Sequence, residues 1–524
     1  MNFPKAVDKM PNLWYNYGQN MPHMPKKQKA EVQMMKRLLI LCLSALLLAG
    51  CASNGPVEKD SETTGGGADT TDTAVQNEET EDTAYLDAVG QRDYGGRDFR
   101  FLLFSTGEEL SWSAFDVLAE EATGEGINDA IYNRNLSIGE RFNVKIVGDM
   151  DAGAAGKLTS MVRAGDSTYD ASFLASASAG SAAQNGDYLD MSALPDIDTD
   201  KPYWDQSCNH DLSIGGKIYF LTGDISTIDK KATWILMFNK NLVSSFDLES
   251  PYTLVNEGRW TVDKFREMSA DVSTDLNGDG AMDQADQYGL ATTPDTVYGL
   301  FYSCGGRFIE KDANDLPVFS VDVDKCSSIL EKTGAIMSDR NATLLSSTIK
   351  GEANVIVAIQ NCFIEGRSLF YGEVMFHVNR LREMADDFGI IPMPKYDEAQ
   401  AHYVTYTNPA GLMLVIPKTT ADVGCTGSVL EAMASLSHTT LTPAYYDNAL
   451  KGKFARDNAS GAMLDLIFEN RVYDLTQIYG WGALPSSYNA LALKGSTDLA
   501  SLIAEKQEKI DTSIEKFVKA FSEE

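Results

Sequence analysis

Strand-like and helix-like segments alternate through the first folded part of the chain, and this alternation constrains the fold more than any other feature. "RDFRFLLFS" has a continuous apolar centre, which is typical of a strand in a sheet covered on both faces. The apolar residues of "INDAIYNRNLSIGERF" recur at near-helical spacing. The expected order is strand (97–105), helix (127–142), strand (144–148), helix (154–164) and strand (169–175). This order predicts a parallel α/β layer.

A second α/β region follows the first. Two strand-like runs, "GGKIYFLTGDIS" (215–226) and "ATWILMFNK" (232–240), are joined by a polar segment. The runs at 355–361, 388–394 and 411–417 are also interpreted as strands, and 498–521 has helical periodicity. With 524 residues, of which 44% are hydrophobic, the chain is long enough for about two or three cores. We expect an α/β fold in which crossing strands join two α/β regions.

The N-terminal part predicts export. Lys36 and Arg37 precede the apolar run "LLILCLSALLLAG", which is too short for a comfortable transmembrane span but typical of a secretory signal. The following "LAGC" resembles the lipobox of bacterial lipoproteins, and this resemblance implies cleavage before Cys51 and lipid attachment to its sulfur. We therefore expect the protein at the extracellular face of the cell membrane, anchored by lipid.

The segments around this signal are not globular. Residues 1–33 are polar and rich in Met and Pro, and we interpret them as an over-extended start before a signal peptide at 34–50. Residues 51–92 include "ETTGGGADTTDTAVQNEETEDT", which has too few apolar residues to offset the loss of chain entropy on folding. This stretch is expected to be a disordered tether.

The charge of the chain argues against two classes of partner, and its cysteines argue against a disulfide framework and a zinc site. The formal net charge of −31 argues against binding nucleic acid or anionic lipid through general electrostatics. Beyond Cys51, the cysteines are odd in number and widely spaced, which fits neither a disulfide framework nor a zinc site. We expect single buried thiols at Cys208, Cys304, Cys326, Cys362 and Cys425.

Residues 275–286, "DLNGDGAMDQAD", have the spacing of a calcium loop. Gly280 is at the sixth place, where the loop must bend sharply, and the twelfth place holds Asp286 where Glu is usual. The predicted ligands are Asp275, Asn277, Asp279, the Ala281 carbonyl, Asp283 and Asp286. A helix precedes the loop and a strand follows it, so we expect a structural calcium ion and not a helix–loop–helix sensor. The alternative is an Asp/Asn/Gly turn without metal.

Several segments together resemble a known family. They are "YDASFLASASAGSAAQNGDYLDMSALP", "SIGGKIYFLTGD", "WILMFNKNLV", "EGRWTVDKFREMSADVSTDLNGDG" and "FGIIPMPKYDEAQ", in this order. The chain resembles extracellular solute-binding proteins of carbohydrate ABC transporters, the family related to maltose-binding protein, in its lipoprotein form.

The resemblance implies a two-lobed, type II periplasmic-binding-protein fold with the ligand in an interlobe cleft. It implies lobe 1 at 93–223 and 352–397, and lobe 2 at 224–351 and 398–475. The C-terminal segment, 476–524, would pack across both lobes. The implied partners are a sugar or oligosaccharide and the permease subunits of an ABC transporter, with the receptor itself a monomer.

Sugar binding requires aromatic rings for the apolar sugar face and polar side chains for the hydroxyls. Aromatic and polar residues adjoin one another near expected strand ends, and the candidate ligand-binding residues are Trp204, Asp224, Trp234, Tyr371, Glu373, Tyr479 and Trp481. Trp481 is flanked by glycines in the late segment where the family carries a stacking aromatic.

No catalytic signature accompanies these residues. The sequence has no HExxH, no GxSxG and no GxGxxG after a strand. We therefore expect a transport receptor and not an enzyme. Two alternatives remain open at this stage: a secreted glycosidase with a calcium clip, which needs two carboxylates in the cleft, and a surface adhesion lipoprotein that uses the calcium loop.

Overall fold

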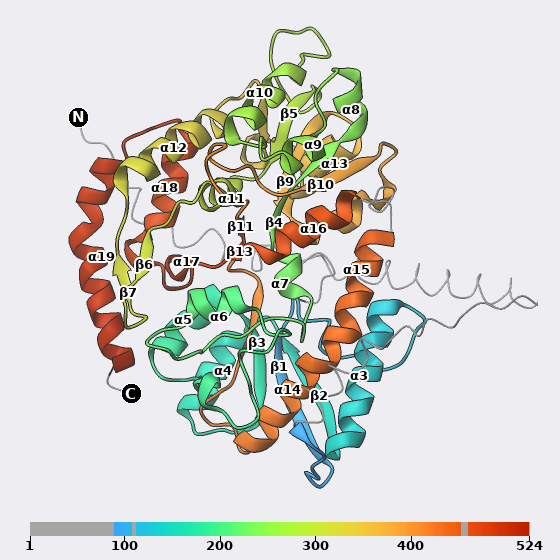
Figure 1. Cartoon of the computed structure of the whole chain (residues 1–524), viewed down its shortest axis with the longest axis vertical. Coiled ribbons are helices and arrows are strands. Elements are labelled where there is room, and N and C mark those ends of the chain that lie inside the picture. The colour runs from blue at the N-terminus through green and yellow to red at the C-terminus, as the bar shows by residue number, and fades with distance from the viewer. Residues whose placement is uncertain (1–88, 107–111, 452–458, 523–524) are drawn as a thin grey trace, which may run out of the picture. The chain divides into compact units, whose positions relative to one another are not determined.

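The computed structural model describes residues 89–106, 112–451 and 459–522, which form two α/β lobes around one sheet each (Figure 1). In the sheet of lobe 1, β1 pairs in parallel with β2 and β3, and β12 pairs antiparallel with β3. The strand order is β12-β3-β1-β2, with bounds β1 Arg97–Phe104, β2 Val144–Asp151, β3 Ala171–Ala175 and β12 Leu412–Val415. The predicted alternation of strands and helices up to residue 175 is confirmed.

The sheet of lobe 2 is also mixed. Strand β9 is parallel to β5 and antiparallel to β4, while β5 is parallel to β8. The order is β10-β4-β9-β5-β8, with bounds β4 Trp234–Asn239, β5 Tyr288–Thr292, β8 Thr343–Leu345, β9 Ser368–Val374 and β10 Phe388–Ile391. Two small ribbons are β6 Ile309–Lys311 with β7 Pro317–Phe319, and β11 Thr405–Tyr406 with β13 Arg471–Val472.

Helices cover the sheets. In lobe 1 they are α3 Gly126–Phe142, α4 Ala154–Arg163, α5 Ser176–Gln184, α6 Gln206–Leu212, α14 Val423–Thr439 and α15 Leu441–Lys451. In lobe 2 they are α8 Lys240–Ser245, α9 Pro251–Asn256, α10 Val262–Val272, α11 Thr296–Ser303, α12 Val323–Met337, α13 Val355–Ile364 and α16 Ala459–Glu469. The short helix α7, Ile228–Lys231, lies where the chain first crosses between the lobes, and η3 spans Met375–Glu383.

The sequence explains these elements locally. Helix α3 begins where the side chain of Glu125 accepts a hydrogen bond from the backbone N–H of Asn128, and it ends at Asn143 in the left-handed conformation. In β1, Phe101 belongs to the same core cluster as Phe142 of α3, whereas its neighbour Leu102 belongs to the cluster that contains Leu158 of α4. The apolar centre of β1 is continuous because helices cover both faces of the sheet.

Strand pairing corrects the predicted lobe boundaries. Residues 352–397 were assigned to lobe 1, but β9 and β10 pair with β4 in the sheet of lobe 2. Residues 398–475 were assigned to lobe 2, but β12 pairs with β3 in lobe 1. The pairing edge of a strand depends on distant residues, and apolar runs of similar composition do not specify it.

Three local predictions were also wrong. The run 215–226 forms no strand and makes only isolated bridges, at Lys217, Leu221 and Gly223. Residues 355–361 form part of helix α13 and not a strand, because Asn354 caps the backbone N–H groups of Ile356 and Val357. The predicted tether, 51–92, extends too far: Val89 is buried in the core of lobe 1, and Arg92 donates to Asp196 and Ser428. The rest of the tether, together with the predicted segments 1–33 and 34–50, lies outside the described residues.

The C-terminal segment contains α17 Leu475–Tyr479, η5 Trp481–Ala483, α18 Leu484–Leu493 and α19 Leu499–Ser522. Helix α17 packs on α5 of lobe 1, α18 packs on α12 of lobe 2, and α19 contacts both α5 and α12. The prediction of buried single thiols is confirmed for all five cysteines from Cys208 to Cys425. No helix in the described part of the chain is long and apolar enough to cross a membrane.

Candidate functional site

The carboxyl ends of the parallel strands meet the places where the chain crosses between the lobes. In lobe 2, Trp234 at the start of β4 pairs with Val374 at the end of β9, and the parallel strand β5 ends at the same edge. In lobe 1, β3 ends at Ala175 opposite Leu412, the first residue of β12. In open α/β sheets, ligands bind beyond the carboxyl ends of the strands, so this interlobe region is the candidate site.

An aromatic pair joins the two lobes at this place. Trp112 follows β1 of lobe 1, and Phe376 follows β9 of lobe 2. Their rings stack with centroids 5.4 Å apart and an interplanar angle of 27°. Both side chains are partly exposed, so the pair presents apolar ring surface where the carboxyl edges of the two sheets meet.

Two acidic residues lie at the carboxyl edge of lobe 2. Asp295 follows β5, and Glu373 is the penultimate residue of β9. Burial raises the pKa of Asp295 to about 7. Burial raises the pKa of Glu373 to about 8, and the nearby charge of Asp295 adds to this effect. The two carboxyl groups are therefore electrostatically coupled and hold protons more tightly than exposed acids.

The hydrogen bonds to Glu373 come from neutral groups, which include the side chain of Thr293. Glu373 Oε1 accepts the backbone N–H of Val374 at 3.0 Å, and Asn489 of α18 donates to the backbone oxygen of Pro294 at 3.1 Å. Burial, with a contribution from Arg380, lowers the pKa of His377 to about 4, so this imidazole is neutral near pH 7. The site thus combines acids and aromatic rings.

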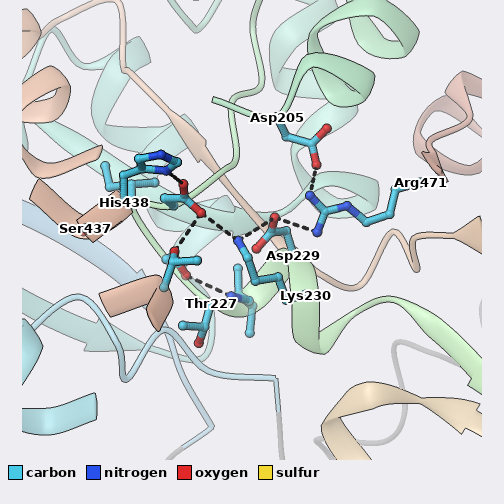
Figure 2. Close-up of polar contacts among 12 residues, drawn as sticks. Asp205, Thr227, Asp229, Lys230, Ser437, His438 and Arg471 are labelled. Carbon is cyan, nitrogen blue, oxygen red and sulfur yellow. Dashed lines mark hydrogen bonds and ion pairs between the residues drawn. The ribbon is translucent and has the colours of Figure 1, made fainter. Parts of the chain in front are cut away.

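A buried ion network lies beside this region, at the hinge (Figure 2). Arg471 of β13 pairs with Asp205, which caps α6, and its Nη1 is 3.0 Å from Asp229 Oδ2. Lys230 Nζ is 3.0 Å from Asp224 Oδ1 and 3.6 Å from Asp229 Oδ2. The cations of the network are therefore matched by carboxylates.

The network fixes the charge states of its members. Burial opposes the charged form of Lys230, but Asp229 and Asp224 together raise its pKa. Burial also opposes ionisation of Asp224, yet Lys230 and hydrogen bonds from His438 and Thr442 leave the pKa of Asp224 well below its usual range. Because α7 and β13 adjoin the interlobe crossings, the network joins the hinge segments to lobe 1.

Of the predicted ligand-binding residues, Glu373 lies at the interlobe edge and Asp224 belongs to the hinge network. Trp204 and Trp234 are each 1% exposed, and the indole N–H of Trp204 donates to Glu431 Oε2 at 3.0 Å. Tyr371 is fully buried, with its ring stacked on Phe363. The faces of these three rings are covered by protein, so they offer no stacking surface in this structure.

Tyr479 and Trp481 pack against the C-terminal helix. Their rings stack on each other with centroids 5.5 Å apart, and both contact Phe517 of α19 edge-on. Trp481 is 5% exposed. Gly480 and Gly482, on either side of Trp481, have positive φ and allow a tight turn. The turn directs the Trp481 ring onto α19.

Sequence reasoning missed Asp295, Trp112 and Phe376. Asp295 comes directly after the run "YGLATTP", so its place at the end of a predicted strand was a usable signal. Trp112 and Phe376 gave no comparable signal, because only the pairing of strands brings them together across the lobes.

The predicted calcium loop joins α10 to β5. Both oxygens of Asp275 accept backbone hydrogen bonds, from Gly278 at 2.7 Å and Gly280 at 2.8 Å. Asp286 is fully buried and accepts the N–H groups of Leu276 and Asp283. Within the described residues, no three His, Cys, Asp or Glu side chains converge closely enough to hold a metal ion.

A separate cavity of about 370 Å³ lies within lobe 2. Its lining includes Cys304, Lys325, Tyr396 and His402, which all belong to one lobe. It is therefore distinct from the interlobe region.

Cys51, the predicted lipidation site, lies outside the described residues.

Comparison with solved structures identifies the fold. The structure is similar to UspC of M. tuberculosis (16% identity, TM-score 0.53, covering 79% of this chain and 100% of that one). It is also similar to a sugar transporter protein of Rhizobium etli in an open conformation (13%, 0.52, 81% and 98%). An ABC substrate-binding protein of Listeria monocytogenes in complex with cycloalternan matches at 12% identity and a TM-score of 0.50 (81% and 99%).

No family model and no curated protein matches the sequence. At these low identities, the structural likeness concerns the fold. The chain has the two-lobed, type II periplasmic-binding-protein fold that the family resemblance implied.

Proposed function

We propose that this protein is an extracellular receptor that captures a sugar or oligosaccharide between its lobes and delivers it to an ABC transporter permease. Ligand contacts to both lobes would favour the closed state, so binding acts as a population shift. The protein would make and break no bond.

The observation that supports the proposal is that the stacked pair Trp112 and Phe376, Asp295 and Glu373 all lie at or just beyond the carboxyl ends of strands β1, β5 and β9. Aromatic rings supply surface for the apolar face of a sugar, and carboxyl groups bind its hydroxyls. The related folds described above include a protein bound to the oligosaccharide cycloalternan, which supports a carbohydrate ligand here.

A glycosidase is less compatible with these acids. Hydrolysis requires one protonated carboxylic acid and one ionised carboxylate, whose environments separate their pKa values. Here burial raises the pKa values of both Asp295 and Glu373, to about 7 and about 8. The environment therefore shifts both pKa values in the same direction.

A ligand screen tests the proposal. The described residues belong to one compact unit, and a soluble form that begins after Cys51 can be purified for thermal-shift and tryptophan-fluorescence assays against a sugar panel. We expect at least one sugar to stabilise the protein and to be recovered unchanged. Trp112→Ala should weaken its binding, whereas Phe246→Ala, at an exposed position in lobe 2, should not. Product formation, or equal effects of the two variants, would argue against the proposal.

We also propose that the loop 275–286 binds calcium as a structural ion. The support is the donor set: Asp275, Asn277, Asp279 and Asp283 offer the hard oxygen ligands that calcium prefers, at the spacing of a calcium loop. Chelation should lower the melting temperature of the wild type and leave an Asp275→Ala/Asp279→Ala variant unchanged. If chelator affected both proteins equally, or neither, the calcium assignment would fail.

Lipid anchoring through Cys51 completes the proposal. The expected position is the outer face of the cell membrane, from which the receptor reaches its permease by the tether. Metabolic labelling with a radioactive or clickable fatty acid should mark the wild type and leave Cys51→Ser unlabelled. Equal labelling of both proteins would exclude Cys51 as the site.

A further inference from the structure

We infer that the ribbon β6–β7 of lobe 2 forms an interlobe clasp, a tie between the lobes that lies apart from the hinge and restrains their relative movement. The clasp is the contact between residues 311–316 of this ribbon and residues 210–216 of lobe 1. Such a tie acts on the movement of the lobes whatever the receptor binds, so it goes beyond the proposed function.

The ribbon is anchored in lobe 2. It lies between α11 and α12 in the chain, and β6 pairs antiparallel with β7. At its base, the ring of Phe308 stacks on Phe301 of α11 with centroids 4.4 Å apart. Helix α19 contacts β7, and the ribbon extends beside this helix from lobe 2 toward lobe 1 (Figure 1). The ribbon is therefore positioned by lobe 2 before it reaches the other lobe.

The turn of the ribbon has a fixed and unusual backbone. Asp312 Oδ1 accepts the backbone N–H groups of Asn314 and Leu316, at 2.8 and 2.9 Å. Asp315 has a φ of 60°, in the left-handed region that residues other than glycine rarely adopt. Such a conformation persists where surrounding contacts hold it. For Asp315, several of these contacts come from lobe 1.

Residues 210–216 belong to lobe 1 and contain the end of α6. Just after them, Leu221 exchanges backbone hydrogen bonds with Leu414 of β12, a strand of the lobe 1 sheet. Ile214 and Lys217 exchange two backbone hydrogen bonds with each other and thereby close a tight turn. This turn faces the turn of the ribbon.

Two glycines of the lobe 1 turn donate to one residue of lobe 2. Gly215 and Gly216 both have positive φ, as the central residues of a two-residue turn of this kind require. The backbone N–H of Gly215 donates to the backbone oxygen of Asp315, and that of Gly216 donates to Asp315 Oδ2, each at 2.9 Å. Asp315 thus satisfies two successive backbone donors of the other lobe.

Lys311 adds a cation to the clasp. Its Nζ donates to Ser213 Oγ at 2.8 Å and to the backbone oxygen of His210, and it lies 2.9 Å from Asp315 Oδ1. Burial opposes ionisation of Asp315, but hydrogen bonds from Lys311 and Gly216 lower its pKa. The side chain of Lys311 is 16% exposed, so solvent screens these charge-assisted hydrogen bonds only in part.

The clasp is separate from the segments that connect the lobes. The chain crosses at α7 and near the paired strands β11 and β13, whereas each side of the clasp lies within one lobe. A rotation of one lobe about these crossings changes the distance between the two turns and so breaks hydrogen bonds of the clasp. Because the lobe arrangements then differ in these contacts, the clasp shifts the equilibrium between them.

Spin labels measure this effect without any ligand. In the soluble form that begins after Cys51, labels are attached at Ser160→Cys on α4 and Glu331→Cys on α12, two exposed positions in different lobes. The five cysteines of the described residues are buried and should not react. Pulsed electron paramagnetic resonance gives the distances between the labels. Hydrogen exchange of residues 210–217 reports whether the clasp is formed.

A double variant removes both charged groups of the clasp. In Lys311→Met/Asp315→Gly, glycine keeps the left-handed backbone at position 315. We expect faster exchange of residues 210–217 and an about 10-fold larger population of separated lobes, seen as longer and broader label distances. Lys311→Met alone should give a smaller shift in the same direction. Glu310→Gln removes an exposed charge from the same ribbon and should change neither readout.

Two results would overturn the inference. If the wild type exchanges residues 210–217 as fast as the double variant, the clasp is not formed. If the variant exchanges them faster but keeps the wild-type label distances, the clasp does not restrain the lobes. Melting curves confirm that each variant is folded, and Lys311→Met alone carries the test if the double variant is not. Neither readout uses a sugar, so its failure leaves the receptor proposal standing, and a failed sugar screen leaves the clasp standing.

Discussion

Asp295 is a residue of the candidate site that lowers the stability of the fold as the pH rises. Its folded-state pKa of about 7 is well above the ordinary value of 3.8, chiefly because of burial. The folded protein therefore holds a proton that the unfolded chain releases. Stability should fall as the pH rises from about 4 to about 7, and the loss is complete above that range. Glu373 acts in the same direction up to about pH 8.

Asp295→Asn should remove most of its share of this loss. We expect the variant to be more stable than the wild type near pH 8, by on the order of 2 to 4 kcal/mol, and about equal to it near pH 4. The charge of Asp295 also raises the pKa of Glu373, so the variant should lower that pKa as well. Urea denaturation at the two pH values measures the difference. If the two proteins differed in stability by the same amount at both pH values, the pKa of Asp295 would not be raised in the folded protein.

At the scale of elements, the hinge ion network joins β13 to α6 and α7. Arg471 in β13 reaches Asp205 at the start of α6 and Asp229 in α7, while β13 itself pairs with the crossing strand β11. A buried network of this kind adds less stability than its number of contacts implies, because desolvation opposes it. Removing one member is nevertheless costly, since its partners remain buried and charged.

Arg471→Met should therefore destabilise the protein by about 3 to 5 kcal/mol. Its side chain is 8% exposed, and the carboxylates of Asp205 and Asp229 would lose their cation. Adding Asp229→Asn should restore part of the loss, because one uncompensated charge disappears. Arg266→Met on the exposed face of α10 is the control and should change little. Chemical denaturation of the three variants measures these effects, and an Arg471→Met protein as stable as the wild type would contradict the argument.

The elements also show which parts of the fold could be predicted from the sequence. The alternating strands and helices up to residue 175 were predictable because their periodicity is local. The placement of β9 and β12 was not, because β9 pairs with β4 and β12 pairs with β3, each more than a hundred residues away, and apolar runs do not encode the partner. The same reason explains the site: Glu373 was found at a strand end, but the contact between Trp112 and Phe376 depends on how the distant strands pair.

At the scale of the whole molecule, the C-terminal segment connects elements of both lobes. Helix α19 contacts α5 and α12, and Phe517 packs against Tyr479 and Trp481. The glycines beside Trp481 predicted an exposed ring for the ligand. Their positive φ angles instead turn the ring into the packing between this segment and the lobes.

Trp481→Ala distinguishes these two roles. If the ring is a packing residue, the variant should lose about 3 to 5 kcal/mol of stability and keep its affinity for any sugar the wild type binds, measured where it remains folded. Phe517→Ala should behave similarly, whereas Lys516→Ala, on the exposed side of the same helix, should have little effect. A Trp481→Ala protein that kept its stability and lost its affinity would return this residue to the ligand site. Because α19 contacts both lobes, the loss of stability should appear as an earlier single unfolding transition and not as a separate melting of one lobe.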